Sequence, residues 1–536
     1  MNTPLALVEV DIHPDLALDE EALRRHCARR GKIPLADVAG LEIRRRSVDA
    51  RRGRVRLHLE VALLGDHPRA LAPQPRPLRG RSGAPRVVIV GAGPAGLFAA
   101  WGLALAGIPA LILERGQAIR PRRRDLAALS QRGELNPESN YCYGEGGAGT
   151  FSDGKLYTRA TKRGPVRAIL EALAAYGAPA EILVDARPHI GTNRLPKVIT
   201  AMREHLASAG VELRFGARVD GLRLRDGSIA GVVLACGQTL DAEAVVLAPG
   251  HSARDVFRWL AAAGVELAFK PFAMGVRIEH PQEVVDRIQF GELAGHAALG
   301  AAYYRLVERP RGGGQAVFSF CMCPGGTIVP AATEAGMQVV NGMSPHHHRG
   351  RFANSGLVTE VSAATLHNAG LDPDDPLAGL AYQAALEARA FEAGGGRFVA
   401  PGQSLRALAA GELDRSLPTT SYHRGTAPAR VDQLLGAELG PRLQRALRGL
   451  DRKMPGFVSD HAVAVGVESR TSSPVRIPRD RESLEATRTP GLYPSGEGAG
   501  YAGGIVSAAV DGLRVAASIS RSMLGTSAWF DELSEG

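Results

Sequence analysis

The sequence predicts an α/β fold with three parts: a parallel-sheet domain, an interleaved α+β domain and a small N-terminal α+β domain. Three observations predict it. A strand, a glycine loop, a helix and a second strand follow one another at residues 86–114, a βαββ pattern fills residues 5–64, and a second glycine-rich segment stands far away at residues 491–504. The chain has 536 residues, enough for about three or four domains.

Composition excludes several classes of protein. Apolar residues make up 45% and charged residues 22%, which is ordinary globular usage and rules out disorder, collagen or a coiled coil as the whole answer. Five cysteines in 536 residues are no disulfide scaffold. The net charge is +9, and residues 1–86 hold 17 Lys/Arg against 11 Asp/Glu. Most of the basic character therefore belongs to the N-terminal part.

No targeting or membrane segment is expected. Glu9 and Asp11 precede any basic region, so the start is no signal peptide. The uncharged stretch 87–113 is long enough to span a bilayer, but Gly91, Gly93 and Gly96 interrupt it. A strand, a turn and a buried helix explain it better. We expect no membrane contact, and a reducing, cytoplasmic setting.

The N-terminal elements follow from charge and alternation. Residues 5–12 predict a strand, and residues 19–30 predict a helix that is acidic at its start, basic at its end and stopped by Gly31. Residues 41–48 and 54–64 predict two more strands. Five prolines then make residues 65–85 a stiff, exposed linker: Pro68, Pro73, Pro75, Pro77 and Pro85.

The strongest motif is VVIVGAGPAGLFAAWGLALAGIPALILERG, which has the spacing of a dinucleotide-binding fingerprint. Gly91 permits the tight turn, Gly93 lets the backbone approach a pyrophosphate, and Gly96 lets the helix pack on the strand. The pyrophosphate would lie at the N-terminus of the helix, where free N–H groups favour anions. Glu114 ends the next strand, and its carboxylate is predicted to accept hydrogen bonds from both ribose hydroxyls. This pattern predicts a Rossmann-like domain.

Two distant segments favour FAD over NAD. The apolar strand 244–248 ends in Pro249-Gly250, and Gly491–Ile505 places Glu497 among glycines before a helix. The N-terminus of that helix can stabilise negative charge on a reduced flavin. Together with the fingerprint, these two segments resemble those of the superfamily of glutathione-reductase-like and hydroxylase-like FAD enzymes. The usual acid of the last motif is Asp, whereas Glu497 reaches one methylene further.

Longer motifs are similar to those of a bacterial family of uncharacterised FAD-dependent dehydrogenases. They are residues 47–51 (SVDAR), 136–156 (NPESNYCYGEGGAGTFSDGKL), 270–280 (KPFAMGVRIEH), 320–326 (FCMCPGG) and 341–344 (NGMS). The likeness covers nearly the whole chain. It implies bound FAD, a split substrate-side domain and an N-terminal α+β domain, and it names no substrate.

The expected cofactor-binding residues come from all of these segments. They are Gly91, Gly93, Pro94, Ala95, Gly96, Glu114, Arg115, Gly146, Gly147, Val219, Gly250, Gly496, Glu497, Gly503, Gly504 and Ile505. The expected domains are residues 1–64, the linker 65–85, an FAD-binding domain formed by 86–254 and 485–524, and a substrate-side domain at 255–484. The tail after Gly525 is expected to be mobile.

Catalytic candidates are few. Cys321 and Cys323 form a C-x-C pair, for which two interpretations stand: a redox role beside the flavin, or two small buried hydrophobes. Lys155 is a third candidate in a loop that also suits a plain surface turn. No metal is expected, because three adjacent histidines point in divergent directions; a solvated loop is favoured for His346, His347 and His348. His189, Arg194, His423 and Arg424 are candidate substrate-side groups only, and a structural polar role is favoured for each of them.

We therefore expect an FAD-dependent oxidoreductase that passes hydride or two electrons to or from a small-molecule or redox-protein substrate. A single fingerprint disfavours a separate NADPH domain, and transient NAD(P)H binding is compatible with it. The alternative is a flavin-containing module that binds RNA or a partner protein through the basic N-terminal domain. Its arginines are Arg44, Arg45, Arg46, Arg51, Arg52, Arg54 and Arg56, but no aromatic residues suited to base stacking alternate with them.

Overall fold

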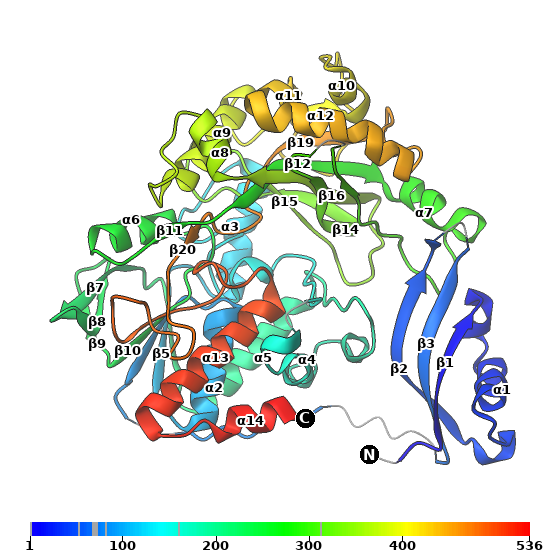
Figure 1. Ribbon diagram of the computed structural model, residues 1–536, viewed down its shortest axis with the longest axis horizontal. Coiled ribbons are helices and arrows are strands. Elements are labelled where there is room, and N and C mark those ends of the chain that lie inside the picture. Colours follow the sequence, from blue (N-terminus) through cyan, green and yellow to red (C-terminus); the bar gives the residue numbers. More distant parts are fainter. Residues whose placement is uncertain are drawn as a thin grey trace.

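The computed structural model describes residues 3–51, 54–66, 73–80, 83–158, 161–310 and 313–535. Figure 1 shows three regions: a parallel sheet with its helices at the bottom, a large, mostly antiparallel sheet under a layer of helices at the top, and a small domain at the right. Of the predicted linker, residues 67–72 and 81–82 lie outside the described residues, as do Pro68 and Arg52.

The small domain has the predicted βαββ order: β1 (Ala6–Ile12), α1 (Glu20–Gly31), β2 (Gly40–Asp49) and β3 (Arg56–Leu64). The strands pair antiparallel with β3 in the centre, and α1 covers one face. Asp19 caps α1 by accepting the N–H of Ala22. The helix ends one residue later than expected, because Lys32 adopts the left-handed cap conformation.

The parallel sheet has the order β21-β10-β4-β5-β6, so a strand from near residue 492 pairs with strands from residues 87–247. Its strands are β4 (Val87–Val90), β5 (Ala110–Glu114), β6 (Glu212–Phe215), β10 (Ala244–Leu247) and β21 (Leu492–Pro494). Alternate residues of β4 pack on opposite faces, Val87 and Ile89 toward the helices and Val88 and Val90 toward a second sheet. Burial on both faces explains why β4, β5 and β10 are almost wholly apolar, whereas the edge strand β6 is only partly buried and carries two charged residues.

Helices cover one face of this sheet, and a small antiparallel sheet covers the other. The helices are α2 (Pro94–Ala106), α4 (Val166–Ala175), α5 (Leu195–Ser208), α13 (Ile505–Leu524) and α14 (Ala528–Glu535), and the small sheet comprises β7 (Val219–Arg225), β8 (Ser228–Leu234) and β9 (Thr239–Asp241), beside α6 (Arg254–Ala262). The expectation of a mobile tail after Gly525 is wrong. The tail forms α14, whose Leu533 is buried, and Trp529 lies against Gly102 of α2.

The large sheet supplies the second wall of the candidate site. Its order is β13-β14-β16-β12-β19-β17-β18, with β15 paired to β14. The strands are β12 (Phe272–Pro281), β13 (Val307–Glu308), β14 (Val317–Pro330), β15 (Val340–Met343), β16 (Phe352–Val361), β17 (Ala400–Ser404), β18 (Thr426–Pro428) and β19 (Val463–Glu468). A two-stranded link, β11 (Ala268–Phe269) with β20 (Val475–Arg476), leads back toward the parallel sheet.

The helices beside this sheet are α7 (Gln282–Phe290), α8 (Ala363–Asn368), α9 (Ala378–Ala393), α10 (Leu405–Ala410), α11 (Val431–Leu434) and α12 (Gly436–Lys453), and α3 (Ile119–Arg132) approaches it from the parallel-sheet side. Strand β12 alternates: Met274, Val276 and Ile278 lie in the apolar core with the helices. Arg277 and Glu279 belong to the alternate set, so they point to the opposite face. That face carries the site described next.

Candidate functional site

The glycine loop after β4 has two glycines that packing requires and one that it does not. A Cβ on Gly91, where φ is +102°, would lie 2.3 Å from the carbonyl oxygen of Ala248, and a Cβ on Gly96 would lie 1.9 Å from that of Gly91. A Cβ on Gly93 would meet only the Cα of Gly147, at 3.9 Å. Gly93 is also the N-cap of α2, and no side chain caps it. The loop therefore leaves uncapped N–H groups beside an open position, which suits an anion.

Glu114 holds this loop in place. Its buried carboxylate accepts the N–H of Ala92 at 2.8 Å with one oxygen, and those of Gly116 and Gly144 at 2.9 Å each with the other. A carboxylate offers about four acceptor sites, so about one remains for a ligand hydroxyl. The predicted contact with two ribose hydroxyls stays a prediction, and the residue has a structural role that the sequence did not indicate.

The remaining glycine segments meet at the same edge of the sheet. A Cβ on Gly147 would lie 3.0 Å from the Cα of Gly93, and one on Gly149 would lie 3.0 Å from Ile505. A Cβ on Gly498 would lie 2.5 Å from the carbonyl oxygen of Gly250. A Cβ on Gly496 would lie 2.7 Å from the Cβ of Ala95, which places the last motif against the first turn of α2.

The N-terminus of α13 is the most open part of this cradle. Gly503 and Gly504 have no atom within 4 Å of the position where a Cβ would stand, and no side chain caps the helix. Glu497 lies just before it, and burial raises the pKa of its carboxyl to about 7 against the opposing charge of Lys270. Two uncapped helix N-termini lined by glycines fit a dinucleotide with a flat, electron-accepting ring.

Arg115 and Val219 are placed differently from the other expected residues. The guanidinium of Arg115 pairs with Glu138 at 2.8 Å and Asp255 at 2.9 Å, so its charge is already balanced. Val219 starts β7, and its side chain is buried in the core beneath the parallel sheet. A cofactor contact of Val219 would therefore have to use its backbone.

The second part of the site is a cluster around Lys155, called here the thiol centre: Asp153, Lys155, Arg277, Cys321 and Cys323. The ammonium of Lys155 lies 3.7 Å from Sγ of Cys321, 3.6 Å from Sγ of Cys323 and 3.1 Å from the carboxylate of Asp153. Arg277 donates to Sγ of Cys323 at 3.2 Å and to the carbonyl oxygen of Cys321 at 2.7 Å. The structure thus brings together all three catalytic candidates.

Local backbone pairing explains how residues far apart in sequence reach this centre. Segment 153–156 pairs with 188–191, through Gly191 N–H to the carbonyl oxygen of Asp153 at 2.9 Å and Leu156 N–H to that of Pro188 at 2.8 Å. In β14 the register with β16 shifts between Phe320 and Cys323, and Cys321 has a φ of +46°. This conformation is rare for a residue other than glycine and is often found at functional sites.

The surroundings of the thiol centre shift the pKa values of the two cysteines in opposite directions. The hydrogen bond from Cys323 and the charges of Lys155 and Arg277 hold the pKa of Cys321 well below its ordinary value, against the effect of burial. The hydrogen bond to Cys321 and burial raise the pKa of Cys323. Glu468 pairs with Arg277 at 3.2 Å, and burial raises the pKa of its carboxyl to about 7.

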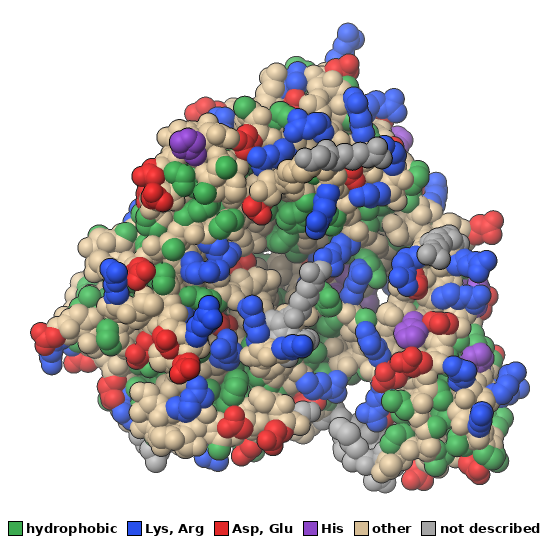
Figure 2. Space-filling view, viewed as in Figure 1, with side chains coloured by type: hydrophobic (Ala, Val, Ile, Leu, Met, Phe, Trp, Pro, Cys, Tyr) green, Lys and Arg blue, Asp and Glu red, His purple; other side chains and the backbone are tan. Residues whose placement is uncertain are grey.

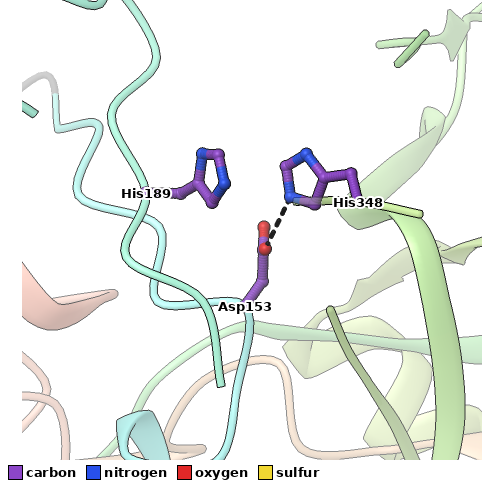
Figure 3. Close-up of side chains that lie close together, drawn as sticks. All are labelled: Asp153, His189 and His348. Carbon is purple, nitrogen blue, oxygen red and sulfur yellow. Dashed lines mark hydrogen bonds and ion pairs between the residues drawn. The ribbon is translucent and has the colours of Figure 1, made fainter. Parts of the chain in front are cut away.

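Figure 3 shows the histidines that flank Asp153. Nε2 of His348 lies 3.1 Å from the Asp153 carboxylate, and the rings of His189 and His348 stack with centroids 4.1 Å apart. His189 in turn bonds through Nε2 to the carbonyl oxygen of His346 at 3.0 Å. One ligand atom of each of Asp153, His189 and His348 lies within 4.8 Å of the others, a spacing that a metal ion could use. However, Lys155 already supplies a positive charge to the same carboxylate.

The histidine run is therefore only in part the solvated loop that we expected. His347 is exposed, but His348 is half-buried and bound to Asp153. Of the other substrate-side candidates, Arg424 donates to the carbonyl oxygens of Gln131 and Arg397, a structural role. His423 lies at a cavity of about 280 Å³ between α3 and β14–β15. Its walls are mostly apolar, from Leu126, Ala127, Tyr141, Phe151, Thr192, Ile328, Val329, Pro330 and Met343, with Arg123, Ser130 and His423 as polar groups.

Sequence reasoning missed Arg277 and a buried ion cluster. Glu387 of α9 is fully buried and pairs with Arg254 at 2.9 Å and with Arg470 at 3.0 Å. This cluster joins the start of α6, near Gly250, to the large sheet. Charged residues within otherwise apolar stretches, such as Arg277 in β12, were the available signal, because a strand buried on both faces carries a charge only where a partner meets it.

The arginines of the small domain are partly neutralised. Arg44 pairs with Glu42, Arg46 with Asp185 and Arg51 with Asp49. Figure 2 shows acidic and basic side chains interspersed over this domain. Such pairing weakens the argument for a nucleic-acid surface, which needs unpaired cations along a backbone.

Comparisons with known proteins show which families and structures this chain is similar to. Residues 271–471 match the family "FAD-dependent protein, C-terminal domain-like", residues 85–128 an FAD binding domain, residues 168–270 "Pyridine nucleotide-disulphide oxidoreductase", and residues 5–63 a domain of unknown function. Among solved structures, an FAD complex of halogenase PltM is 12% identical and covers 84% of this chain and 72% of its own, with a TM-score of 0.39. Flavin-dependent brominase Bmp2 is 14% identical and covers 85% of this chain and 84% of its own, with a TM-score of 0.33.

Within the described ranges, none of the helices combines the length and the apolar character that a membrane span requires. An "Uncharacterized protein" of Clostridium beijerinckii is 37% identical over 527 residues, which cover 94% of this chain and 97% of that protein. The predicted mixed α/β fold with a Rossmann-like FAD-binding domain is confirmed. The chain belongs to the same family as the Clostridium protein, an uncharacterised family of proteins with FAD-dependent domains.

Proposed function

We propose that this protein is an FAD-dependent oxidoreductase that exchanges hydride or two electrons with a small substrate bound between the parallel sheet and the large sheet. The observation that carries the proposal is the convergence of four glycine segments, near Gly93, Gly147, Gly250 and Gly504, at the carboxyl edge of the parallel sheet. Ligands of open α/β sheets bind at that edge. A place in the glutathione-reductase-like superfamily and a cytoplasmic setting belong to the same proposal.

When bound, FAD supplies the two-electron chemistry. The residues of the chain bind the FAD, orient the substrate and tune the electronic properties of the flavin. The N-terminus of α2 would hold the pyrophosphate, with Glu114 fixing the loop. The N-terminus of α13 would face the ring and favour its negative charge. Lys155 lies on the substrate side, where its ammonium can stabilise an anion. We include transient NAD(P)H as an electron donor in this proposal.

The mostly apolar cavity beside His423 supports a small, largely apolar substrate with a polar end that Arg123 or His423 would bind. Its wall residue Phe151 stands two residues from Asp153 of the thiol centre, and Thr192 stands three residues from His189 beside it. A substrate that enters there would therefore approach Lys155.

Gly93→Ala tests the proposal, with Gly221→Ala as the matched control. In both, the added methyl group meets one atom, at 3.9 Å, and neither glycine has a positive φ. We expect both variants to keep the free energy of unfolding of the FAD-free protein within about 1 kcal/mol. Only Gly93→Ala should weaken FAD binding, by about tenfold or more, because the methyl group occupies the approach of the pyrophosphate.

Fluorescence titration of FAD-free protein measures both dissociation constants. Wild-type protein should be yellow as purified and should release FAD on denaturation. Colourless protein that does not take up FAD, or equal FAD affinity in the two variants, would contradict the proposed site.

A further inference from the structure

The C-x-C pair has an arrangement that neither a buried hydrophobe nor a plain turn explains. Both sulfurs lie within 3.7 Å of a single ammonium, that of Lys155, and the sulfur of Cys323 also accepts a hydrogen bond from Arg277. Arg277 is fully buried. Two cations directed at two sulfurs in a largely buried place stabilise negative charge on sulfur rather than a neutral thiol.

The two cysteines differ in access. Cys323 is fully buried, whereas Cys321 is only partly buried. A thiol that attacks an external molecule must be reachable, and a thiol that completes an internal disulfide need not be. The directions of the pKa shifts agree with this order, because the bond from Cys323 and the charges of Lys155 and Arg277 lower the pKa of Cys321, whereas that bond and burial raise the pKa of Cys323.

Backbone geometry permits a bond between the pair. Alternate residues of an extended strand lie about 6–7 Å apart at Cα, the upper end of the range for a disulfide. The positive φ of Cys321 and the shift in register between Phe320 and Cys323 take this stretch of β14 out of the extended form. The sulfur of Cys323 donates to the carbonyl oxygen of Cys321 at 3.3 Å, and both sulfurs contact the same ammonium, which holds the two side chains on one side of the strand.

We propose that Cys321 and Cys323 form a redox-active dithiol for which the substrate class is a small disulfide, with Cys321 as the attacking and Cys323 as the resolving cysteine. The proposal deepens the proposed function and rests on it for the supply of electrons. It assigns a role to Lys155, which contacts the attacking sulfur, and to Arg277, which contacts the resolving sulfur and the backbone of Cys321 and adds positive charge to the pair.

The steps balance as thiol–disulfide exchange. The Cys321 thiolate attacks one sulfur of R–S–S–R, so a Cys321–S–S–R bond forms and R–S⁻ leaves. The sulfur of Cys323 then attacks Sγ of Cys321. The Cys321–Cys323 bond forms, the bond to R breaks, a second R–S⁻ leaves, and the Cys323 proton ends on one of the two leaving thiolates. The internal disulfide takes two electrons and one proton from reduced FAD and returns to one thiolate and one thiol.

The first experiment measures alkylation of each cysteine by iodoacetamide from pH 5 to pH 9 in the folded full-length protein, with peptide mass spectrometry as the readout. Cys236 is the internal control, because it is exposed, and the thiol centre does not include it. At pH 6 we expect Cys321 to react at least about tenfold faster than Cys236, since the thiolate fraction changes tenfold per pH unit below the pKa. Equal pH profiles for the two cysteines would overturn the assignment.

Lys155→Met tests the cause, with Lys162→Met as the control at an exposed lysine. Removal of the ammonium should shift the labelling midpoint of Cys321 upward by one pH unit or more and leave that of Cys236 unchanged. Lys162→Met should shift neither. If Lys155→Met leaves the Cys321 profile unchanged, the ammonium does not stabilise the thiolate and the proposal fails.

The second experiment incubates the protein in glutathione buffers of increasing oxidised fraction. We expect wild-type protein to form an internal disulfide, seen as a peptide lighter by two hydrogen atoms than the dithiol form, whereas Cys323→Ser should trap glutathione on Cys321. A pair that stays reduced in oxidised glutathione alone overturns the proposal, and so does glutathione on Cys236 but not on Cys321.

These results separate the two proposals. Thiol labelling and disulfide formation need no flavin, so they can succeed even if the protein binds no FAD, which would refute only the proposed function. The link between the two is tested by reoxidation of photoreduced, FAD-loaded protein with oxidised glutathione under argon. Wild-type protein should regain its yellow colour, and Cys321→Ser should do so at least about tenfold more slowly. Equal rates would overturn the dithiol as the carrier.

Discussion

The carboxylate of Glu114 accepts the backbone N–H of Ala92 at 2.8 Å, which ties the end of β5 to the glycine loop that starts α2. With its bonds to Gly116 and Gly144, the same side chain fixes three loops beneath the proposed cofactor. The residue is therefore a structural anchor as well as a predicted ribose ligand, and its substitution should disturb both functions.

Glu114→Ala should lower the free energy of unfolding by about 3 kcal/mol or more, because three buried N–H groups lose their acceptor at about 1–3 kcal/mol each. FAD binding should weaken as well. Urea denaturation of the FAD-free protein measures the first effect. Glu243→Ala is the control, since Glu243 forms an exposed pair with Arg86, and it should change stability by less than about 1 kcal/mol. Similar losses in the two variants would refute the anchoring role.

Glu387→Ala should be among the most destabilising substitutions in the chain. It leaves the buried guanidinium groups of Arg254 and Arg470 without their shared carboxylate, at a cost of about 3–5 kcal/mol. Glu392→Ala, at an exposed position of the same helix, is the matched control and should be nearly neutral. Thermal and urea unfolding followed by circular dichroism compare them. A neutral Glu387→Ala would show that the cluster contributes no net stability.

The carboxyl of Glu497 predicts a pH dependence with a definite sign. Burial raises its pKa from 4.5 to about 7, so the folded state favours the neutral form. Its contribution to stability is fully present below pH 4.5 and is lost as the pH rises through 7. Relative to wild type, Glu497→Gln should therefore gain stability between pH 5 and pH 8, by about 2–3 kcal/mol at 1.4 kcal/mol per pKa unit.

Urea denaturation of the FAD-free protein at pH 5, 6, 7 and 8 measures this difference. Glu468, whose carboxyl has the same pKa of about 7, titrates in both proteins and cancels in the comparison. A difference between wild type and variant that stays constant with pH would mean that Glu497 ionises normally in the folded protein.

Removal of residues 1–84 should leave a body that still binds FAD but unfolds at lower temperature. None of the glycine segments of the cradle belongs to the removed part, whereas the apolar core of the small domain is continuous with that of the large sheet. The flavin spectrum and melting temperature of the truncated protein measure both expectations. Arg46→Ala, which removes one exposed ion pair, is the mild control. An insoluble or FAD-free fragment would place the small domain within the folding core.

Local patterns in the sequence predicted the local structure well. The segment from Val87 to Glu114 folds as the predicted strand, helix and strand, with Gly107 as the C-cap of α2, because each element depends on neighbours in sequence. The βαββ order of the small domain followed from alternation and helix-end charges for the same reason.

Long-range features could not be predicted in this way. The thiol centre depends on a left-handed backbone at Cys321 and on the pairing of segments 153–156 and 188–191, neither of which leaves a periodic signal. The bond of His348 to Asp153 joins residues 195 positions apart, so a run of three histidines gave no indication of it. The motifs around Cys321 and Lys155 named the candidates, and only the fold brings them together.

The small domain touches the protein on both sides of the proposed substrate space. Arg46 forms a strand bridge to the segment before His189, with backbone hydrogen bonds of 3.0 Å to Val184 and 2.9 Å to Ala186, while Asp15 meets His296 beyond α7 at 2.9 Å. The small domain therefore links the two halves of the protein. Because the apolar core of the small domain is continuous with that of the large sheet, the short backbone bridge at Arg46 is the contact more easily broken if the two halves hinge apart to admit a substrate. The small domain should then move with the large sheet and release the cofactor-side half.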